Sequence, residues 1–459
     1  MGGHISTNQT TQLLFTQDDE TWIVDPGVSI AVNGDDAVFS SWRASTLVNK
    51  GQISASGVGN VGVLFVGPGY DGVIKNSGKI SSDGGIAIRI DTNFVGVTTV
   101  VKNLKGGILE SPTSQVTLLC DDGNETVVNA GRIGSLNATV QTTVHLGEGD
   151  DHFTNFQKIG KKVVSGTVLG VIQLGAGNDT FLGGRKIEVV RDDGGSDTYK
   201  FGGGNDTYFA TGAGASDGND IVAGGSGIDT FSAAGSLNSV FINLDSKVHG
   251  YAIVSVAANT AQGDDVSGGL INSDKVIGFE NVFGGEANDI IFGNNADNEL
   301  NGFSGADRLF GFGGNDLLRG SAGSDLLVGG KGRDTLLSDS KYFNDGSGDT
   351  FQYLSLKDST PAKEGRDVIF QDGFADGRDI IHLSTIDANA KNGGATNEAF
   401  QFLGVDVAFG SAPGGLRVIT KDFGWLVQGE VNGDKKADFA IQVNDPTHTI
   451  SWSDADFVL

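Results

Sequence analysis

The stretch at residues 284–337 reads GGEANDIIF GNNADNELN GFSGADRLF GFGGNDLLR GSAGSDLLV GGKGRDTLL. It consists of six consecutive nonapeptides with a glycine-rich start, an acidic or amide residue at position 6 and an aliphatic residue at position 8. The pattern predicts a six-residue turn followed by a three-residue strand. So short a unit cannot bury its apolar side chain alone, and we therefore expect a solenoid of stacked coils.

Position 6 of these nonapeptides carries the candidate metal ligands. In the unbroken run they are Asp289, Asp307, Asp316, Asp325 and Asp334, with Asn298 in the second unit. More dispersed copies upstream supply Asp151, Asp179, Asp197, Asp206, Asp220 and Asp229. Glycines allow the positive φ angles of tight turns and leave backbone carbonyls accessible, and aspartate adds a carboxylate. Such a set of oxygens suits Ca²⁺, with six to eight ligands, better than Mg²⁺ or Zn²⁺.

These nonapeptides resemble the RTX, or hemolysin-type, calcium-binding repeats of proteins that Gram-negative bacteria export. The resemblance implies a parallel β-roll in which several Ca²⁺ ions lie between aspartate carboxylates and glycine carbonyls of adjacent turns. It assigns the eleven aspartates above as ligands, together with Gly302, Gly305, Gly311, Gly313, Gly320, Gly329 and Gly332. Asn298 lacks the charge and predicts a weaker site. The alternative is a set of glycine turns with surface aspartates and no metal.

A second repeat precedes the nonapeptides and has the core Asn-X-Gly-X-Ile. Its asparagines are Asn49, Asn76, Asn103, Asn129 and Asn155, and NFQKI at 155–159 is read as a degenerate last copy. The spacing of 26 or 27 residues, with β-branched runs between glycine turns, predicts a right-handed parallel β-helix. We expect the asparagines to stack their amides at a turn; a row of ligand-binding amides is the alternative.

The chain divides into four predicted segments. Residues 1–20 are an N-terminal tail, 21–165 the parallel β-helix, and 166–340 the RTX β-roll with an insert at 232–283 that continues the solenoid. Residues 341–459 resemble the C-terminal domain of serralysin-type exoproteins, through DVIFQDGFADGRDIIHLS, AFQFLG, VNGDKKADF and the terminal DFVL. This resemblance implies a β-rich domain with an uncleaved signal for a type I secretion apparatus, ending in Asp456 and three apolar residues.

The loop VNGDKKADF has a second possible metal pattern. Glu430, Asn432, Asp434 and Asp438 occupy positions 1, 3, 5 and 9 of an EF-hand-like loop. Lys435 stands where glycine is expected, and residue 441 is Ile in place of the bidentate Glu. A plain hairpin turn is the favoured interpretation.

The amino-acid composition excludes several classes of binding partner. Lys+Arg 31 against Asp+Glu 57 gives 31 − 57 = −26, so nucleic acid and anionic membranes are poor partners. No apolar run is long enough for a transmembrane segment, and the N-terminus lacks the pattern of a cleaved signal peptide. The single cysteine, Cys120, is expected in the core. With the RTX resemblance, these features predict a secreted extracellular or cell-surface protein.

The sequence indicates the function less directly than the fold and the metal ligands. No His-Glu-X-X-His occurs, the six histidines are scattered, and no catalytic residue is predicted. We expect a calcium-binding protein that folds outside the cell and acts as an adhesin-like surface or matrix protein, with a polysaccharide or cell-surface ligand. The alternative is a carbohydrate-active enzyme, a uronate polysaccharide lyase or epimerase, on the N-terminal β-helix. A basic stripe of Lys50, Lys75, Lys79, Lys102 and Arg132 would serve it, although a solvated outer face is the commoner explanation for these residues.

Overall fold

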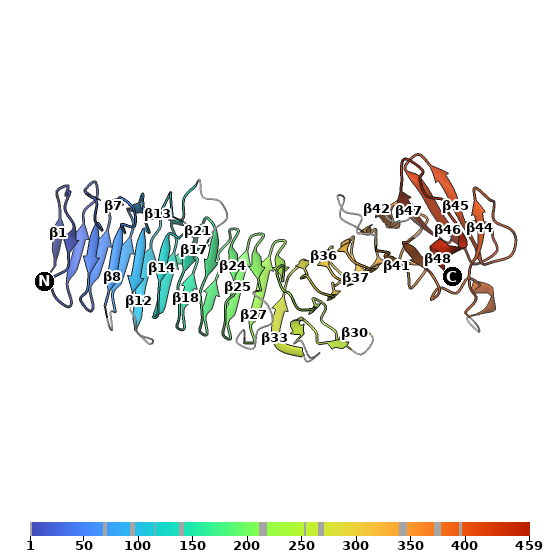
Figure 1. Cartoon of the computed structure of the whole chain (residues 1–459), viewed down its shortest axis with the longest axis horizontal. Helices are drawn as coiled ribbons and strands as arrows, with labels where there is room; N and C mark the ends of the chain where they lie inside the picture. The colour runs from blue at the N-terminus through green and yellow to red at the C-terminus, as the bar shows by residue number, and fades with distance from the viewer. Residues whose placement is uncertain are drawn as a thin grey trace. The chain divides into compact units, whose positions relative to one another are not determined.

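The computed structural model describes residues 2–67, 71–91, 97–114, 116–136, 142–210, 218–251, 254–264, 270–338, 347–370, 378–393 and 397–459. It consists of two compact units, residues 1–230 with 272–278, and residues 231–271 with 279–459. The described residues form strands and short 3-10 helices, as the predicted all-β class requires (Figure 1). None of their helices has the length and apolar character needed to cross a membrane.

The first unit is a parallel β-helix with three sheets. Sheet A contains β1 (Gly3–Ile5), β3 (Thr21–Val24), β6 (Thr46–Asn49), β9 (Val73–Asn76), β12 (Thr98–Asn103), β15 (Asn124–Asn129), β18 (His152–Thr154), β23 (Thr180–Leu182), β25 (Thr198–Gly203), β27 (Ile221–Ser226) and β33 (Leu270–Ile277). Sheet B contains β4 (Ser29–Asn33), β7 (Gln52–Ser56), β10 (Lys79–Ser82), β13 (Ile108–Glu110), β16 (Arg132–Ile133) and β21 (Thr167–Val168). Sheet C contains β2 (Leu13–Leu14), β5 (Val38–Ser40), β8 (Val63–Val66), β11 (Ile88–Asp91), β14 (Leu118–Cys120), β17 (Thr142–His145), β22 (Val171–Gln173), β24 (Val189–Arg191) and β26 (Thr207–Phe209). β28 (Thr230–Ser232) follows these strands.

The coil shortens where sheet B ends. Sheet A pairs Asn49 with Asn76, 27 residues later, but pairs Phe181 with Tyr199, 18 residues later. Eighteen residues are two nonapeptides, each with one turn and one strand. The parallel β-helix therefore passes into a two-sheet β-roll within the first unit. Its core is a column of buried side chains, in which the rings of Phe153 and Phe181 stack 5.9 Å apart.

Residues 1–20, which the sequence predicts as a tail outside the solenoid, contribute the first coil of the β-helix. Gly3 pairs with Trp22 in sheet A, and Leu13 pairs with Val38 in sheet C. The reason is apolar burial, because Leu13 and Phe15 lie in the core and cover the end of the stack.

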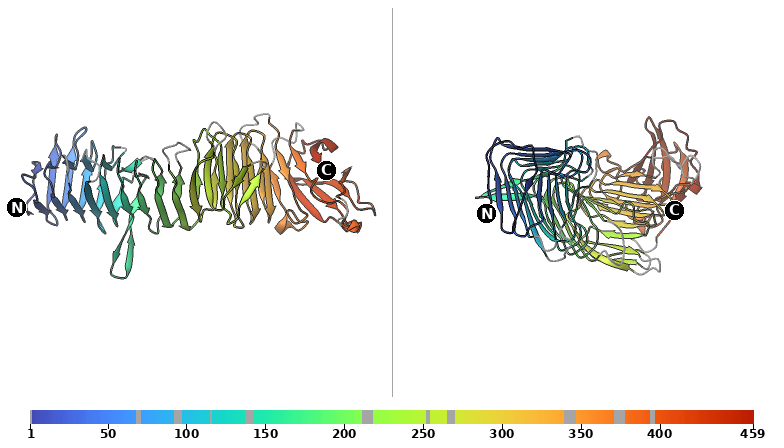
Figure 2. Two further views of the ribbon diagram at one scale, coloured as in Figure 1. Left: turned by 90° about the horizontal axis from the view of Figure 1, so that it is seen from below. Right: turned by 60° about the vertical axis from the view of Figure 1, so that its left-hand side comes forward.

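The degenerate last asparagine repeat is interrupted by a hairpin. β19 (Phe156–Ile159) and β20 (Lys162–Ser165) pair antiparallel and project from the stacked coils (Figure 2, left). The coil resumes at Gly166, whose N–H donates to the carbonyl of Asn155 at 2.8 Å. Ile133 consequently pairs with Val168 and not with Ile159, so NFQKI at 155–159 is not a coil of the β-helix.

The second unit repeats the two-sheet pattern. One sheet contains β34 (Asn281–Phe283), β36 (Glu299–Ser304), β38 (Leu317–Ala322), β40 (Thr335–Leu337), β42 (Val368–Phe370) and β47 (Phe439–Asn444). The other contains β29 (Val240–Asn243), β35 (Ile290–Phe292), β37 (Arg308–Gly313), β39 (Leu326–Lys331), β41 (Thr350–Gln352), β43 (Ile380–His382) and β48 (Phe457–Val458). Leu300 pairs with Leu318, and Leu309 with Leu327. Successive nonapeptides therefore alternate between the two sheets, and their turns form two rows.

The insert adds an outer layer to this unit. β32 (Thr260–Asp264) pairs antiparallel with β29, and β30 (His249–Tyr251) forms a hairpin with β31 (Val254–Val256). The ring of His249 lies 4.4 Å from that of Phe312. Phe312 occupies position 2 of its nonapeptide at φ 72°, a conformation that favours glycine. Packing against the insert offsets this backbone strain, so the expected plain continuation of the solenoid is only part of the insert's structure.

The C-terminal strands extend the second unit. β44 (Gln401–Val405) runs parallel to β45 (Gly415–Lys421), and β45, β46 (Gly424–Glu430) and β47 form an antiparallel meander. Short 3-10 helices lie at Lys363–Gly365, Ala390–Asn392 and Asp454–Asp456. The region is β-rich, as expected.

Candidate metal sites in the nonapeptide turns

The position-6 aspartates form hydrogen-bonded ladders across successive coils. Each of the eleven predicted aspartates is at most 2 % exposed. In the second unit, Oδ1 of Asp307 accepts from the backbone N–H of Asp289 at 2.7 Å, and Oδ1 of Asp325 accepts from that of Asp307 at 2.8 Å. Along the other row of turns, Oδ1 of Asp334 accepts from the N–H of Asp316 at 2.9 Å.

The first unit has the same ladders. Along the turns between sheets C and A, the N–H of Asp151 donates to Oδ1 of Asp179 at 2.7 Å, and that of Asp179 to Asp197 at 2.6 Å. The ladder continues from Asp197 to Asp220 at 2.8 Å. On the opposite edge, the N–H of Asp206 donates to Oδ1 of Asp229 at 2.8 Å.

The ladders include acidic residues that the sequence analysis missed. They are Glu125, Glu188, Asp274, Asp349, Asp367 and Asp379. The first five are each hydrogen-bonded in register with a predicted aspartate, and Oδ1 of Asp379 accepts from the N–H of Asp349 at 2.9 Å. None of the six stands at position 6 of a full glycine pattern, and two of them are Glu in place of Asp. An acidic residue two positions before a buried apolar one was the available signal.

The second carboxylate oxygens are suited to a cation. Oδ2 of Asp179, Asp307, Asp316 and Asp334 is buried and accepts no hydrogen bond from the described residues. An unsatisfied buried oxygen costs about 1–3 kcal/mol, and more when it is charged. A hard divalent cation such as Ca²⁺ would satisfy these oxygens. The donor set therefore fits the metal, and these aspartates are the side chains that would hold it.

Burial raises the pKa of these carboxyl groups. The pKa reaches about 8 for Asp307 and Asp316 and about 7 for Asp289, with loss of hydration as the largest cause. Hydrogen bonds from backbone N–H groups lower the pKa of each one but do not compensate for burial. Without a cation, Asp307 and Asp316 therefore favour the protonated carboxyl at neutral pH in the folded chain.

The predicted glycines fall into three groups. A Cβ at Gly302, Gly311, Gly320 or Gly329 would overlap Oδ2 of the aspartate in the same nonapeptide, so these glycines leave room for the carboxylate. Gly305 and Gly332 have φ angles of 118° and 139° and make the turn possible. Gly313 has neither property, since its Cβ would meet nothing closer than 3.2 Å.

Asn298 differs from its neighbours as its missing charge suggests. Its Oδ1 accepts from the N–H of Asn294 at 2.8 Å, and its Nδ2 donates to the carbonyl of Glu280 at 2.9 Å. Its side chain is thus satisfied by the protein. Asp289 also accepts on Oδ2, from the N–H of Gly285 at 2.6 Å.

One group of three carboxylates lies inside the first unit. Oxygens of Asp192, Asp197 and Asp220 lie within 4.8 Å of one another, and all three residues are buried. The Tyr199 hydroxyl lies 2.9 Å from both Asp192 Oδ1 and Asp197 Oδ2, and that of Tyr208 lies 3.1 Å from Asp220 Oδ2. This group could hold an ion in addition to the turn ladders.

The asparagine repeat forms a second type of ladder. The Nδ2 of Asn49 donates to Oδ1 of Asn76 at 2.8 Å, and the pattern continues through Asn103 and Asn129 to Asn155. The amide of Asn155 then donates to Oε1 of Glu188 at 2.9 Å. The expected amide stacking is present, and it joins the acidic ladder where the coil loses sheet B.

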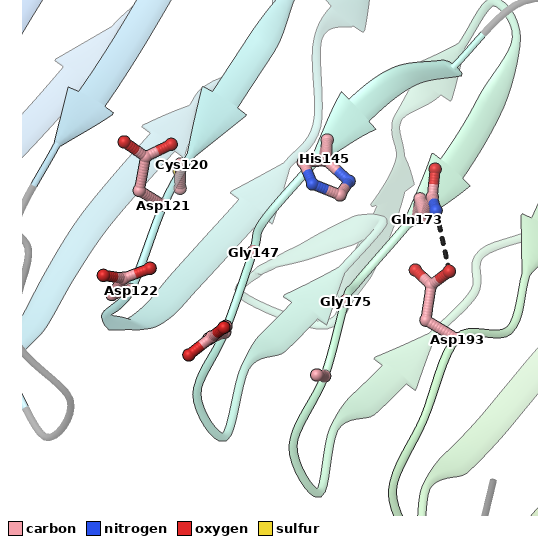
Figure 3. Close-up of a pocket in the computed structure, with 10 residues that line it drawn as sticks. Cys120, Asp121, Asp122, His145, Gly147, Gln173, Gly175 and Asp193 are labelled. Carbon is pink, nitrogen blue, oxygen red and sulfur yellow. Dashed lines mark hydrogen bonds between the residues drawn. The ribbon is translucent and has the colours of Figure 1, made fainter. Parts of the chain in front are cut away.

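A pocket of about 390 Å³ lies beside the turns of the first unit (Figure 3). His145 and Gln173 project into it, and Gln173 Nε2 donates to Asp193 Oδ1 at 2.7 Å. Burial, with the neighbouring Asp91, raises the pKa of Asp121 to about 6. Cys120 also lines the pocket, but it is a buried core residue whose pKa burial raises.

The remaining candidates are structural. The Glu430 carboxylate accepts from the N–H groups of Asn432, Gly433 and Asp434 in the loop between β46 and β47. Ile441 lies buried in β47, so the EF-hand position 12 is not available.

The predicted basic stripe is divided between two sheets. Lys75 and Lys102 are cross-strand neighbours in sheet A, whereas Lys79 and Arg132 form ion pairs with Glu110 in sheet B.

The fold and turns define a calcium-binding β-roll, and comparison with known proteins agrees. The model of the RTX calcium-binding nonapeptide repeat matches four times, at residues 173–208, 215–235, 283–318 and 310–340. The chain therefore carries RTX repeats, and these bind Ca²⁺. Comparison with curated proteins finds no match to this chain.

Two solved structures show limited similarity. A subunit of the mannuronan C5-epimerase from Azotobacter vinelandii is 22% identical over 38% of this chain and 78% of its own, with a TM-score of 0.19. The extracellular lipase of Serratia marcescens is 12% identical over 79% of this chain and 67% of its own, with a TM-score of 0.21.

Proposed function

We propose that this chain is a secreted calcium-binding protein that folds on Ca²⁺ binding outside the cell and acts there as an adhesin-like surface or matrix protein. The observation that carries the proposal is the buried Oδ2 atoms of Asp179, Asp307, Asp316 and Asp334, which accept no hydrogen bond from the part of the chain that the structure describes. They lie in ladders along the rows of turns. These oxygens disfavour the folded chain without a cation and favour it with one.

Calcium-dependent folding follows from the thermodynamic linkage between Ca²⁺ binding and folding. Where Ca²⁺ is scarce, burying the ionised aspartates opposes folding. Where Ca²⁺ is abundant, its binding free energy becomes folding free energy, because the site does not exist in the unfolded chain. Export of an unfolded chain followed by folding outside is the sequence of events that this physics supports.

The test is circular dichroism of the full chain at pH 8, first in chelator and then in millimolar Ca²⁺. We expect loss of the β signal in chelator and its recovery with Ca²⁺, with Mg²⁺ at the same concentration as the control. Equal β content in chelator would contradict calcium-dependent folding.

Export through a type I apparatus is the second part of the proposal. The terminal segment is built into the fold: the Phe457 ring lies 5.5 Å from Trp452 and 5.2 Å from Phe402, and Asp456 caps a 3-10 helix. A signal packed in this way is accessible only before folding. Deletion of residues 454–459 should retain the protein inside the cell, and unchanged export would contradict the assignment.

The pocket supports a carbohydrate-active enzyme as a second candidate function. Carboxyl groups with raised pKa values, Asp121 and Asp193, lie in it with His145, and such groups serve general acid–base chemistry on glycosides. Its acidic lining suits sugar hydroxyls better than uronate carboxylates. The test is product release from neutral and uronate polysaccharides by the calcium-loaded protein, with Asp121→Asn as the variant; absence of product from both contradicts this candidate.

A further inference from the structure

The hairpin of residues 156–165, the basic arm, differs in charge from the rest of the chain. Lys158, Lys161 and Lys162 lie at its tip and are exposed, and the arm contains no acidic residue. The whole chain carries −26, so a local concentration of cations is the exception in this molecule.

A second pair of cations lies next to the base of the arm. The N–H of Arg185 donates to the Oγ of Ser165, the last residue of β20, at 3.1 Å. The Lys186 ammonium donates to the hydroxyl of Thr167. Arg185 and Lys186 are exposed, so five cationic side chains gather along the arm and the adjoining turn.

The arm has little structural purpose in the β-helix. Among the described strands, β19 and β20 pair only with each other, and the coil closes beneath them through the hydrogen bond from Gly166 to Asn155. A two-stranded hairpin is marginally stable in water. Four residues per strand extend it about 13 Å, which exceeds the screening length of about 8 Å at physiological salt. The lysines at the tip are therefore largely screened from the acidic coils.

We propose that the basic arm is a docking site for a polyanionic polysaccharide chain carrying carboxylate or sulfate groups. The inference rests on the proposed surface or matrix role and gives it a partner. The positive charge of the arm favours a polyanionic ligand. Because the arm projects from the acidic coils, a ligand that is a single thin chain can contact the arm without approaching them. A single chain can reach the tip alone, whereas a membrane or a nucleic acid duplex presents a broad anionic surface that also meets the acidic coils.

The side-chain pattern of the arm also disfavours a membrane. Cross-strand partners share a face, and Lys158 pairs with Val163 while Ile159 pairs with Lys162. Each face thus mixes an apolar residue with a lysine, and neither offers the continuous apolar surface that insertion into lipid needs.

The experiment measures binding of calcium-loaded full-length protein to heparin and to polygalacturonate, with neutral dextran as the control ligand. The variant carries Lys158→Ser, Lys161→Ser and Lys162→Ser. The matched control carries Lys75→Ser, Lys102→Ser and Lys105→Ser, which removes the same charge from another face of the same unit. We expect at least a tenfold loss of affinity in the first variant only. The slope of log K against log salt should fall by about 2.

Three outcomes overturn the proposal. They are equal affinity of the arm variant and the parent protein, an equal loss in the control variant, and arm-dependent binding to phosphatidylglycerol vesicles or duplex DNA without binding to either polysaccharide. Circular dichroism with and without Ca²⁺ is recorded for every variant. Failure of calcium-dependent folding is thereby distinguished from failure of polysaccharide binding.

Discussion

Position-6 aspartates such as Asp307 and Asp316 have two separate roles. One oxygen accepts a backbone N–H from the preceding coil, while the other remains for a cation, as at Asp307 and Asp316. Register and metal binding thus depend on the same side chain. A substitution that impairs metal binding but keeps the hydrogen bond to the preceding coil would separate the two roles.

Gly311→Ala removes space without removing a ligand. The added Cβ would overlap Oδ2 of Asp316, so we expect weaker Ca²⁺ binding and a loss of about 1–3 kcal/mol in the free energy of unfolding. Gly313→Ala is the control, because its Cβ has no contact shorter than 3.2 Å. Calcium titration followed by thermal unfolding measures both; similar losses in the two variants would contradict the role given to Gly311.

Removal of Ca²⁺ should make stability fall as pH rises. Burial raises the pKa of Asp307 and Asp316 from 3.8 to about 8, so the folded chelated protein binds more protons than the unfolded chain. Their contribution is complete below about pH 3.8 and is lost as pH rises to about 8. Circular dichroism in chelator at pH 5 and pH 8 checks this, because more of the chain should keep its β signal at pH 5; a larger β signal at pH 8 would refute it. With Ca²⁺ present, protons compete with the metal and the trend should reverse.

The asparagine ladder supports the corner between sheets A and B. Asn103→Ala removes one bond to each neighbouring amide, at 2.9 Å on both sides, and leaves buried polar atoms less well satisfied. We expect a loss of about 2–4 kcal/mol. Asn33→Ala, at an exposed position of sheet B, is the matched control. Thermal unfolding in saturating Ca²⁺ provides the measurement, and equal midpoints for the two variants would refute the role of the ladder.

The sequence predicted the elements wherever its period was regular. Spacings of 9 and of 26 or 27 residues fixed both the coil types and the position-6 aspartates. Prediction was poorer at departures from the period. The sequence does not single out Glu188 because Glu replaces Asp in its turn, and it predicts a coil in place of the basic arm because Asn155 and Ile159 match the asparagine motif. The insert's packing on Phe312 depends on tertiary contacts that no local pattern contains.

For the whole molecule, the charge of −26 belongs to the chain without metal. On the order of ten Ca²⁺ ions, one per well-formed turn, would add about +20. We therefore expect electrophoretic mobility toward the anode to fall severalfold between chelator and millimolar Ca²⁺ once the change in size is measured independently. Unchanged charge per molecule would show that far fewer ions bind.

The closed corner under the basic arm makes residue 155 a natural point of insertion. Because Gly166 donates to the carbonyl of Asn155, the two ends of the hairpin are already adjacent in the coil. A loop of another length can join them at little cost in chain entropy, and the stacked register on either side does not change. The scaffold and its recognition element can therefore vary independently: one solenoid can present different appendages while its calcium-binding turns stay the same.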